Sequence, residues 1–156
     1  MTFDAATEPS SDPLEHVEDA SLSAVLDALV PPDGDLPGAG GLGLGQAVRS
    51  GARQAEPLGV GASRVLDALP AGFGELTSDQ QVEQLALLEQ RDPAAFGALV
   101  NLTYNAYYTD PRVLERIEAK TGYAARPPQP EGYELPPFDE QLLEVVRQRE
   151  PFWREA

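Results

Sequence analysis

The sequence predicts an all-α protein, a small irregular helical bundle with proline- and glycine-rich loops and an extended C-terminal arm. Apolar residues recur at helical spacing in several segments, and prolines and glycines separate these segments. We find no convincing alternation of apolar and polar residues of the kind that marks a β-strand. We expect a disordered acidic tail over 1–20, a helical domain over 21–123, and a proline-rich arm with a terminal helix over 124–156.

A first helix is expected to begin at Ser21. Its apolar residues lie three and four positions apart, which places them on one face. They are Leu22, Val25, Leu26 and Leu29. The pair Pro31–Pro32 ends this helix, because proline has no backbone N–H to continue the hydrogen bonding.

A long glycine-rich loop over 33–45 follows the first helix. Helical character resumes over 46–54 and again over 58–69. In the second of these segments we expect Val65, Leu66 and Leu69 to be buried.

A helix with a clear start signal follows at Ser78, since Ser78 and Gln81 have the spacing of a capping box. It continues to about Arg91. Its predicted apolar face consists of Val82, Leu85 and Leu88.

The strongest helix begins at Asp92–Pro93, with aspartate as the N-cap and proline at the first helical position. Asp110–Pro111 repeats this arrangement and starts a shorter helix, which ends near Lys120 before Gly122. Six residues of the longer helix share one predicted face: Phe96, Leu99, Val100, Thr103, Tyr104 and Tyr107. Beyond Gly122, residues 124–137 are rich in proline and are expected to be extended, and a last amphipathic helix is expected over about 139–149.

The composition excludes several function classes. The chain has 26 acidic against 11 basic side chains, a net charge of -15, which disfavours nucleic acid and anionic membrane surfaces as partners. It contains no cysteine, which rules out disulfides, thiol nucleophiles and cysteine-ligated metals. No apolar run is long enough to span a bilayer and the start lacks a secretory or twin-arginine signal, so we expect a cytoplasmic protein without membrane insertion.

Three possible chemical sites are weak. Residues 38–43 match G-x-G-x-x-G, but a helix and two prolines precede them rather than a strand, so a flexible loop is the better interpretation. His16, the single histidine, lies in the predicted tail, away from any serine. Asp27, Asp33 and Asp35 lack the spacing of a calcium loop and are better interpreted as helix-end and turn residues. We therefore predict no catalytic, cofactor-binding or metal-binding residue in this chain.

The aromatic residues from 104 onward indicate a partner-binding surface. All five tyrosines fall between residues 104 and 133, and adjacent tyrosines on a helix point about 100° apart, so Tyr107 and Tyr108 cannot both face the core. Tyrosine and tryptophan are favoured at protein interfaces. The predicted contact residues are Tyr104, Tyr107, Tyr108, Asp110, Pro111, Arg112, Tyr123, Gly132, Tyr133, Phe138 and Trp153.

The same segment resembles a known family. Residues 107–113 (Tyr-Tyr-Thr-Asp-Pro-Arg-Val), followed by Gly122–Tyr123 and by 127–133, are similar to the C-terminal signature of the gluconate 2-dehydrogenase subunit 3 family. Residues 26–34 and 37–39 resemble that family's opening helix and loop. Residues 96–100 lie where the family often has an aromatic-rich helix.

This resemblance implies a non-catalytic small subunit that binds and stabilises a large FAD-dependent oxidoreductase of the glucose–methanol–choline (GMC) type. Such complexes oxidise sugars, sugar acids, glycosides or polyols, and the FAD belongs to the large subunit. The hetero-oligomer is therefore the expected state, with no cofactor in this chain. Two alternatives stay open: a free-standing helical adaptor or chaperone, and a carboxylate-dependent hydrolase.

Overall fold

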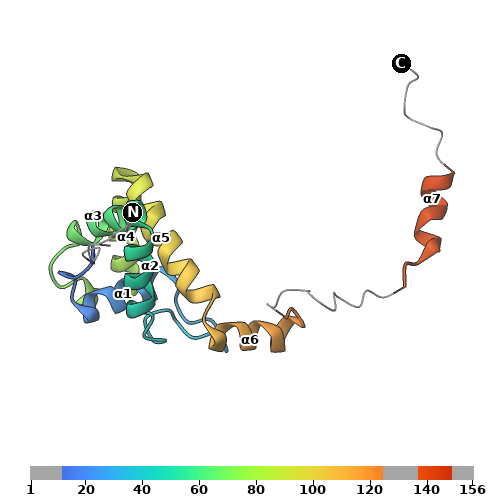
Figure 1. Cartoon of the computed structure of the whole chain (residues 1–156), viewed down its shortest axis with the longest axis horizontal. Coiled ribbons are helices and arrows are strands. Elements are labelled where there is room, and N and C mark those ends of the chain that lie inside the picture. Colours follow the sequence, from blue (N-terminus) through green and yellow to red (C-terminus); the bar gives the residue numbers. More distant parts are fainter. Residues whose placement is uncertain (1–11, 125–136, 149–156) are drawn as a thin grey trace, which may run out of the picture. The chain divides into compact units, whose positions relative to one another are not determined.

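The computed structural model describes residues 12–124 and 137–148. The chain divides into two units, residues 1–124 and 125–156, which are described separately below. The first unit is built from helices joined by loops, and the described residues include no strand, which confirms the predicted fold class (Figure 1). Its elements are α1 (Asp19–Leu29), α2 (Gly45–Gln54), α3 (Glu56–Asp67), the 3-10 turn η1 (Phe73–Glu75), α4 (Ser78–Arg91), α5 (Pro93–Tyr108) and α6 (Pro111–Thr121).

Helix α5 is the centre of the first unit. It packs most extensively on α3 and also contacts α1, α2, α4 and α6. Small residues bring α3 and α5 close together: a Cβ atom added at Gly61 would lie 2.8 Å from the Cβ of Ala98. Leu99, which is fully buried, and Leu102 extend this contact into the hydrophobic core.

The buried face of α5 differs from the predicted one. Leu99, Thr103 and Tyr107 are buried as expected, but Tyr104 is 46% exposed. The buried set also contains Ala95, Ala98 and Leu102, which were not predicted. The close approach of α3 explains the difference, because small side chains fit where two helix backbones nearly touch.

The two Asp-Pro helix starts are confirmed. Asp92 Oδ1 accepts a hydrogen bond from the Ala95 amide at 3.0 Å, and α5 begins at the next residue, Pro93. Asp110 caps α6 in the same manner. Gly122 ends α6 with a positive φ of 73°, which glycine adopts without steric cost.

The N-cap of α4 is Thr77, one residue before the predicted Ser78. The capping box is formed by Thr77 and Gln80 rather than by Ser78 and Gln81: Thr77 N donates to Gln80 Oε1 at 3.0 Å, and Gln80 N donates to Thr77 Oγ1 at 3.4 Å. Both pairs have the correct spacing. Gln81 is used elsewhere, since its side-chain amide donates to the Phe73 carbonyl of η1 at 3.1 Å.

Residues 12–20 were expected in a disordered tail, but the structure packs them onto the helical unit. Leu14 is fully buried, and the Val17 amide donates to its carbonyl at 3.0 Å to form a turn. Helix α1 then begins at Asp19, two residues before the predicted start at Ser21. Residues 1–11 of the predicted tail lie outside the described residues.

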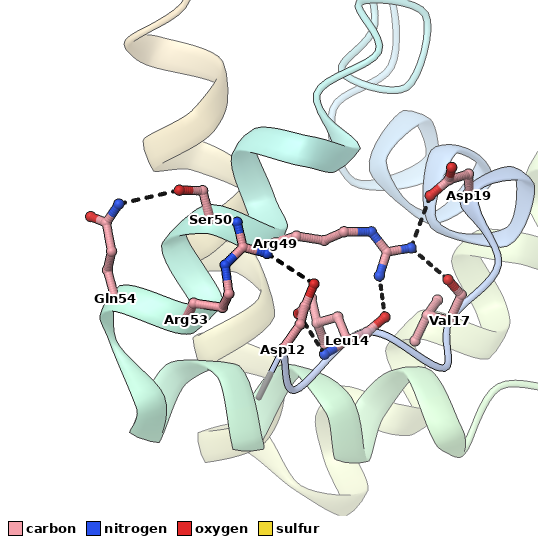
Figure 2. Close-up of polar contacts among 8 residues, drawn as sticks. All are labelled: Asp12, Leu14, Val17, Asp19, Arg49, Ser50, Arg53 and Gln54. Atoms are coloured by element: carbon pink, nitrogen blue, oxygen red, sulfur yellow. Dashed lines mark hydrogen bonds and ion pairs between the residues drawn. The ribbon is translucent and has the colours of Figure 1, made fainter. Parts of the chain in front are cut away.

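The buried Arg49 of α2 holds this N-terminal segment (Figure 2). Its guanidinium donates hydrogen bonds to the backbone carbonyls of Leu14 and Val17 and to Asp19 Oδ1, the last at 2.9 Å. Arg53, one turn later on α2, pairs with Asp12 at 3.0 Å. One long charged side chain therefore satisfies two backbone acceptors of a segment that has no regular secondary structure.

The apolar positions predicted within residues 58–69 and on α4 were confirmed only in part. Val65 and Leu66 are buried as predicted, whereas Leu69 is half-buried. On α4, Leu85 is buried, but Val82 is 56% exposed because α4 buries only a narrow stripe at the edge of the bundle.

The second unit is described only over residues 137–148. It contains a 3-10 turn, η2 (Glu140–Leu143), and a short helix, α7 (Glu144–Arg147). Asp139 caps η2 by accepting from the Gln141 amide at 3.0 Å. The helix predicted over about 139–149 thus begins as a 3-10 turn, and its α-helical part is Glu144–Arg147. None of the helices in the described ranges combines the length and apolar character that crossing a bilayer requires.

Candidate partner interface

Tyr107 is an internal residue of the first unit. Its side chain is 3% exposed, and its hydroxyl donates a hydrogen bond to the Pro37 carbonyl at 2.9 Å. Burial, followed by the proximity of Tyr108, raises the pKa of Tyr107 above its usual value. The Tyr107 ring, which the sequence placed among the partner contacts, is therefore packed in the core of the first unit.

Asp110 and Arg112 form a tight pair at the start of α6. Asp110 Oδ1 accepts hydrogen bonds from the Arg112 amide and from Arg112 Nε, both at 2.9 Å, and Oδ2 accepts from the guanidinium at 2.8 Å. These bonds to Arg112 lower the pKa of Asp110, and the carboxylate raises the pKa of Arg112. Pro111 lies between them at the first helical position and is exposed. Arg112 is thus paired with a carboxylate of its own chain.

Residues 107–116 also hold the loop between α1 and α2. Besides the Tyr107 bond, Arg112 donates to the Leu42 carbonyl at 2.9 Å, and Arg116 donates to the Asp35 carbonyl. We call these three donors, Tyr107, Arg112 and Arg116, the loop clamp. The two stretches that carry the family resemblance, one near residue 37 and one near residue 110, therefore contact each other.

Asp27 of α1 holds the same loop from its glycine-rich part. Asp27 Oδ1 accepts from the amides of Gly40 at 2.8 Å and Gly41 at 3.1 Å. A Cβ atom at Gly40 would overlap both the Ser23 carbonyl oxygen and the Asp27 carboxylate. The G-x-G-x-x-G match thus reflects close packing of a loop against α1, and the loop is fixed rather than flexible.

Three tyrosines are displayed on the surface of the first unit. The exposed fractions are 46% for Tyr104, 52% for Tyr108 and 61% for Tyr123. Tyr108 contacts the rings of Tyr104 and Tyr107 edge-on, with centroid distances of 5.8 and 5.1 Å. These edge-to-face contacts orient the Tyr108 ring while leaving half of its surface available.

The remaining predicted contact residues belong to the second unit. Phe138 is 65% exposed, and Leu142 beside it is 66% exposed. Gly132, Tyr133 and Trp153 lie outside the described residues.

His16 is held in place, contrary to the prediction, but not in a catalytic order. Its Nε2 lies 2.6 Å from Asp67 Oδ1, and Ser63 Oγ donates to Asp67 Oδ2 at 3.4 Å. In a serine hydrolase the imidazole contacts the serine and the carboxylate contacts the imidazole. Here the carboxylate lies between the other two groups, so the imidazole is not placed to take the serine proton.

The aspartates considered as cation ligands have structural partners. Asp27 accepts the two glycine amides, and Asp33 exchanges backbone hydrogen bonds with Leu36, both at 2.9 Å. Asp35 supplies its carbonyl to Arg116. Within residues 12–124 and 137–148, no three His, Cys, Asp or Glu side chains are grouped to hold a metal ion.

Sequence reasoning missed the residues that bond to backbone atoms. Arg49, Arg116 and Asp27 each bond to main-chain groups. Every residue carries such groups, so the type of the bonded residue does not reveal the contact. The sequence signal for a buried arginine was the position of Arg49, directly after Val48 in a helix with an apolar face.

Comparisons of this chain with protein-family models, with curated proteins and with solved structures found no match.

Proposed function

We propose that this chain is a non-catalytic small subunit that binds and stabilises a large FAD-dependent oxidoreductase of the GMC type. The substrate of the complex would be a sugar, a glycoside or a polyol, and the flavin would belong to the large subunit. The proposal rests on the resemblance of residues 107–113 and 26–39 to the gluconate 2-dehydrogenase subunit 3 family.

The observation that carries the proposal is the loop clamp. Tyr107 bonds to the Pro37 carbonyl, 70 residues earlier in the chain, which joins the two resembling stretches. Arg112 bonds to the Leu42 carbonyl, just beyond the earlier stretch. Contact between two separate resembling segments supports a fold shared with that family more strongly than either segment does alone. The clamp leaves Tyr104, Tyr108 and Tyr123, which are exposed, as the tyrosines of this region that a partner can bury.

Purification from the native host tests this function. The tagged chain is expected to retain a large protein whose eluate shows the visible absorbance bands of an oxidised flavin. Recovery of the chain alone, colourless and at 16.7 kDa, would contradict the proposal. Retention of a flavin-free client that dissociates readily would favour the adaptor alternative instead.

The double substitution Tyr108→Ala with Tyr123→Ala tests the contact residues. Buried interface tyrosines typically contribute about 2 kcal/mol or more each, so affinity should fall by at least roughly tenfold for each ring. Because both side chains are more than half exposed, the isolated subunit should remain folded by circular dichroism. Val60→Ala with Val82→Ala, which also truncates two exposed apolar side chains, provides the matched control. Equal retention of the flavoprotein by both double variants would remove the tyrosines from the interface.

A further inference from the structure

Helix α5 contains no charged side chain in its 16 residues, although charged residues make up 24% of the chain. Several of its residues are exposed and would be free to carry charge, including Gly97, Asn101 and Asn105. Depletion of charge together with exposed tyrosine is the composition that distinguishes the centre of a protein interface from ordinary surface.

The uncharged character is local to this part of the molecule. Residues 93–124 contain three acidic and three basic side chains, whereas residues 12–92 contain fourteen acidic and four basic ones. The first unit thus combines a strongly acidic region with a neutral one. The exposed side of α5 is the uncharged part of that neutral region.

A groove adjoins this exposed side. It has a volume of about 610 Å³, lies between α2 and α5, and is lined by ten residues, none of them charged. Leu58, Leu102 and Ala106 supply apolar atoms, and the amide side chains of Gln54 and Asn105 stand at its margin. Asn105 is both exposed on α5 and part of the groove lining, so the two surfaces are continuous.

The two amides retain hydrogen-bonding capacity. Gln54 Nε2 donates to Ser50 Oγ at 3.2 Å, and Asn105 Nδ2 donates to Asn101 Oδ1 at 2.8 Å. Each amide group has a second N–H and a carbonyl oxygen beyond these bonds. Amide donors and acceptors beside an apolar floor suit an uncharged stretch of polypeptide, whose backbone offers the complementary groups.

We propose that the exposed side of α5 and this groove form one docking surface, which receives an uncharged segment of a different protein that is less acidic than this chain. The inference rests on the proposed function and names the surface used for it. Charge complementarity selects the occupant. A second copy would bring two chains of net charge -15 together, whereas a neutral segment flanked by basic residues would be attracted by the acidic region and would meet no buried charge.

Substituting Asn105→Lys tests the docking surface without weakening the helix. Lysine has a higher helix propensity than asparagine, and a positive charge near the C-terminal end of α5 is favoured by the helix dipole. The matched control is Gln90→Lys, an exposed position on α4 that adds the same charge outside the surface. Both variants should melt at the temperature of the wild-type chain within about 3 °C.

The probe is the flavoprotein recovered with the wild-type chain, applied to all three proteins at equal concentrations. Asn105→Lys is expected to weaken binding by at least tenfold and Gln90→Lys by less than twofold. Binding of Asn105→Lys within twofold of the wild type would overturn the docking surface while leaving the proposed function intact. If the wild-type chain recovers no flavoprotein, the proposed function fails and this inference with it. A wild-type dimer in analytical ultracentrifugation that Asn105→Lys converts to a monomer would overturn the choice of occupant.

Discussion

Removal of the Arg49 guanidinium should destabilise the first unit strongly. In Arg49→Met the side-chain stem keeps much of its volume, but the Val17 carbonyl loses its donor and the Leu14 carbonyl keeps only the Val17 amide. Each buried acceptor left without a partner costs about 1–3 kcal/mol. The third contact, with Asp19, adds little, because the Asp19 side chain is 81% exposed and its charge is screened by water. We therefore expect the free energy of unfolding to fall by about 2 kcal/mol, most of it from the Val17 carbonyl.

Urea denaturation followed by circular dichroism measures this loss, and Asp19→Asn is the control. Asp19→Asn should cost less than about 1 kcal/mol, since it removes only the exposed contact. Hydrogen exchange adds a local test: the Val17 amide, which bonds to the Leu14 carbonyl, should lose protection in Arg49→Met. The reasoning would be refuted if Arg49→Met unfolded within 1 kcal/mol of the wild type, or if Asp19→Asn proved equally damaging.

Three further predictions concern the loop and its clamp. Gly40→Ala should destabilise by several kcal/mol, because its Cβ would overlap α1. Gly97→Ala should stabilise by roughly 0.5–1 kcal/mol, because Gly97 is an exposed helix position with nothing within 4 Å of the added Cβ. Thermal melting of both variants compares them directly. Tyr107→Phe should cost about 1 kcal/mol at neutral pH. Because the pKa of Tyr107 is raised on folding, its contribution to stability is present below the unfolded pKa and is lost as pH rises through the folded pKa. Tyr107→Phe should therefore lose less stability in alkali than the wild type does. Urea titration from pH 8 upward measures this difference. The pKa of Asp110 is lowered on folding, so its contribution is present above the unfolded value and is lost as pH falls through the folded one; Arg112→Gln should raise the Asp110 pKa toward normal, which carboxyl NMR shifts would detect, and an unchanged pKa would contradict the pairing.

The parts of the fold that the sequence predicts well are those signalled by adjacent residues. Asp92 and Asp110 each precede a proline, and together these residues encode both the N-cap and the first helical position. Gly122 marks a helix end because the left-handed conformation there favours glycine. Such signals act within a few residues of chain and need no knowledge of tertiary contacts.

The features that the sequence does not predict depend on contacts between distant elements. Tyr104 and Tyr107 both lie at helical spacing with Leu99 and Val100, yet Tyr107 is buried and Tyr104 exposed. Tyr107 bonds to Pro37 of the distant loop between α1 and α2, a contact that helical spacing does not reveal. Leu14 is the same case, since two apolar residues, Leu14 and Val17, in an acidic segment are too few to establish a periodicity that indicates burial. For the candidate interface, the sequence indicated an aromatic region, but the division into internal and displayed tyrosines required the three-dimensional packing.

The loop clamp has a consequence for synthesis on the ribosome. Pro37 is translated 70 residues before Tyr107, the donor to its carbonyl. At elongation rates of about 5–20 residues per second, this interval lasts roughly 4–14 s. Helix α5, which contacts every other helix of the first unit, is translated late in the same interval. The nascent chain therefore carries α1 and the loop after it without their central helix for several seconds, and the packing of these early elements waits for translation.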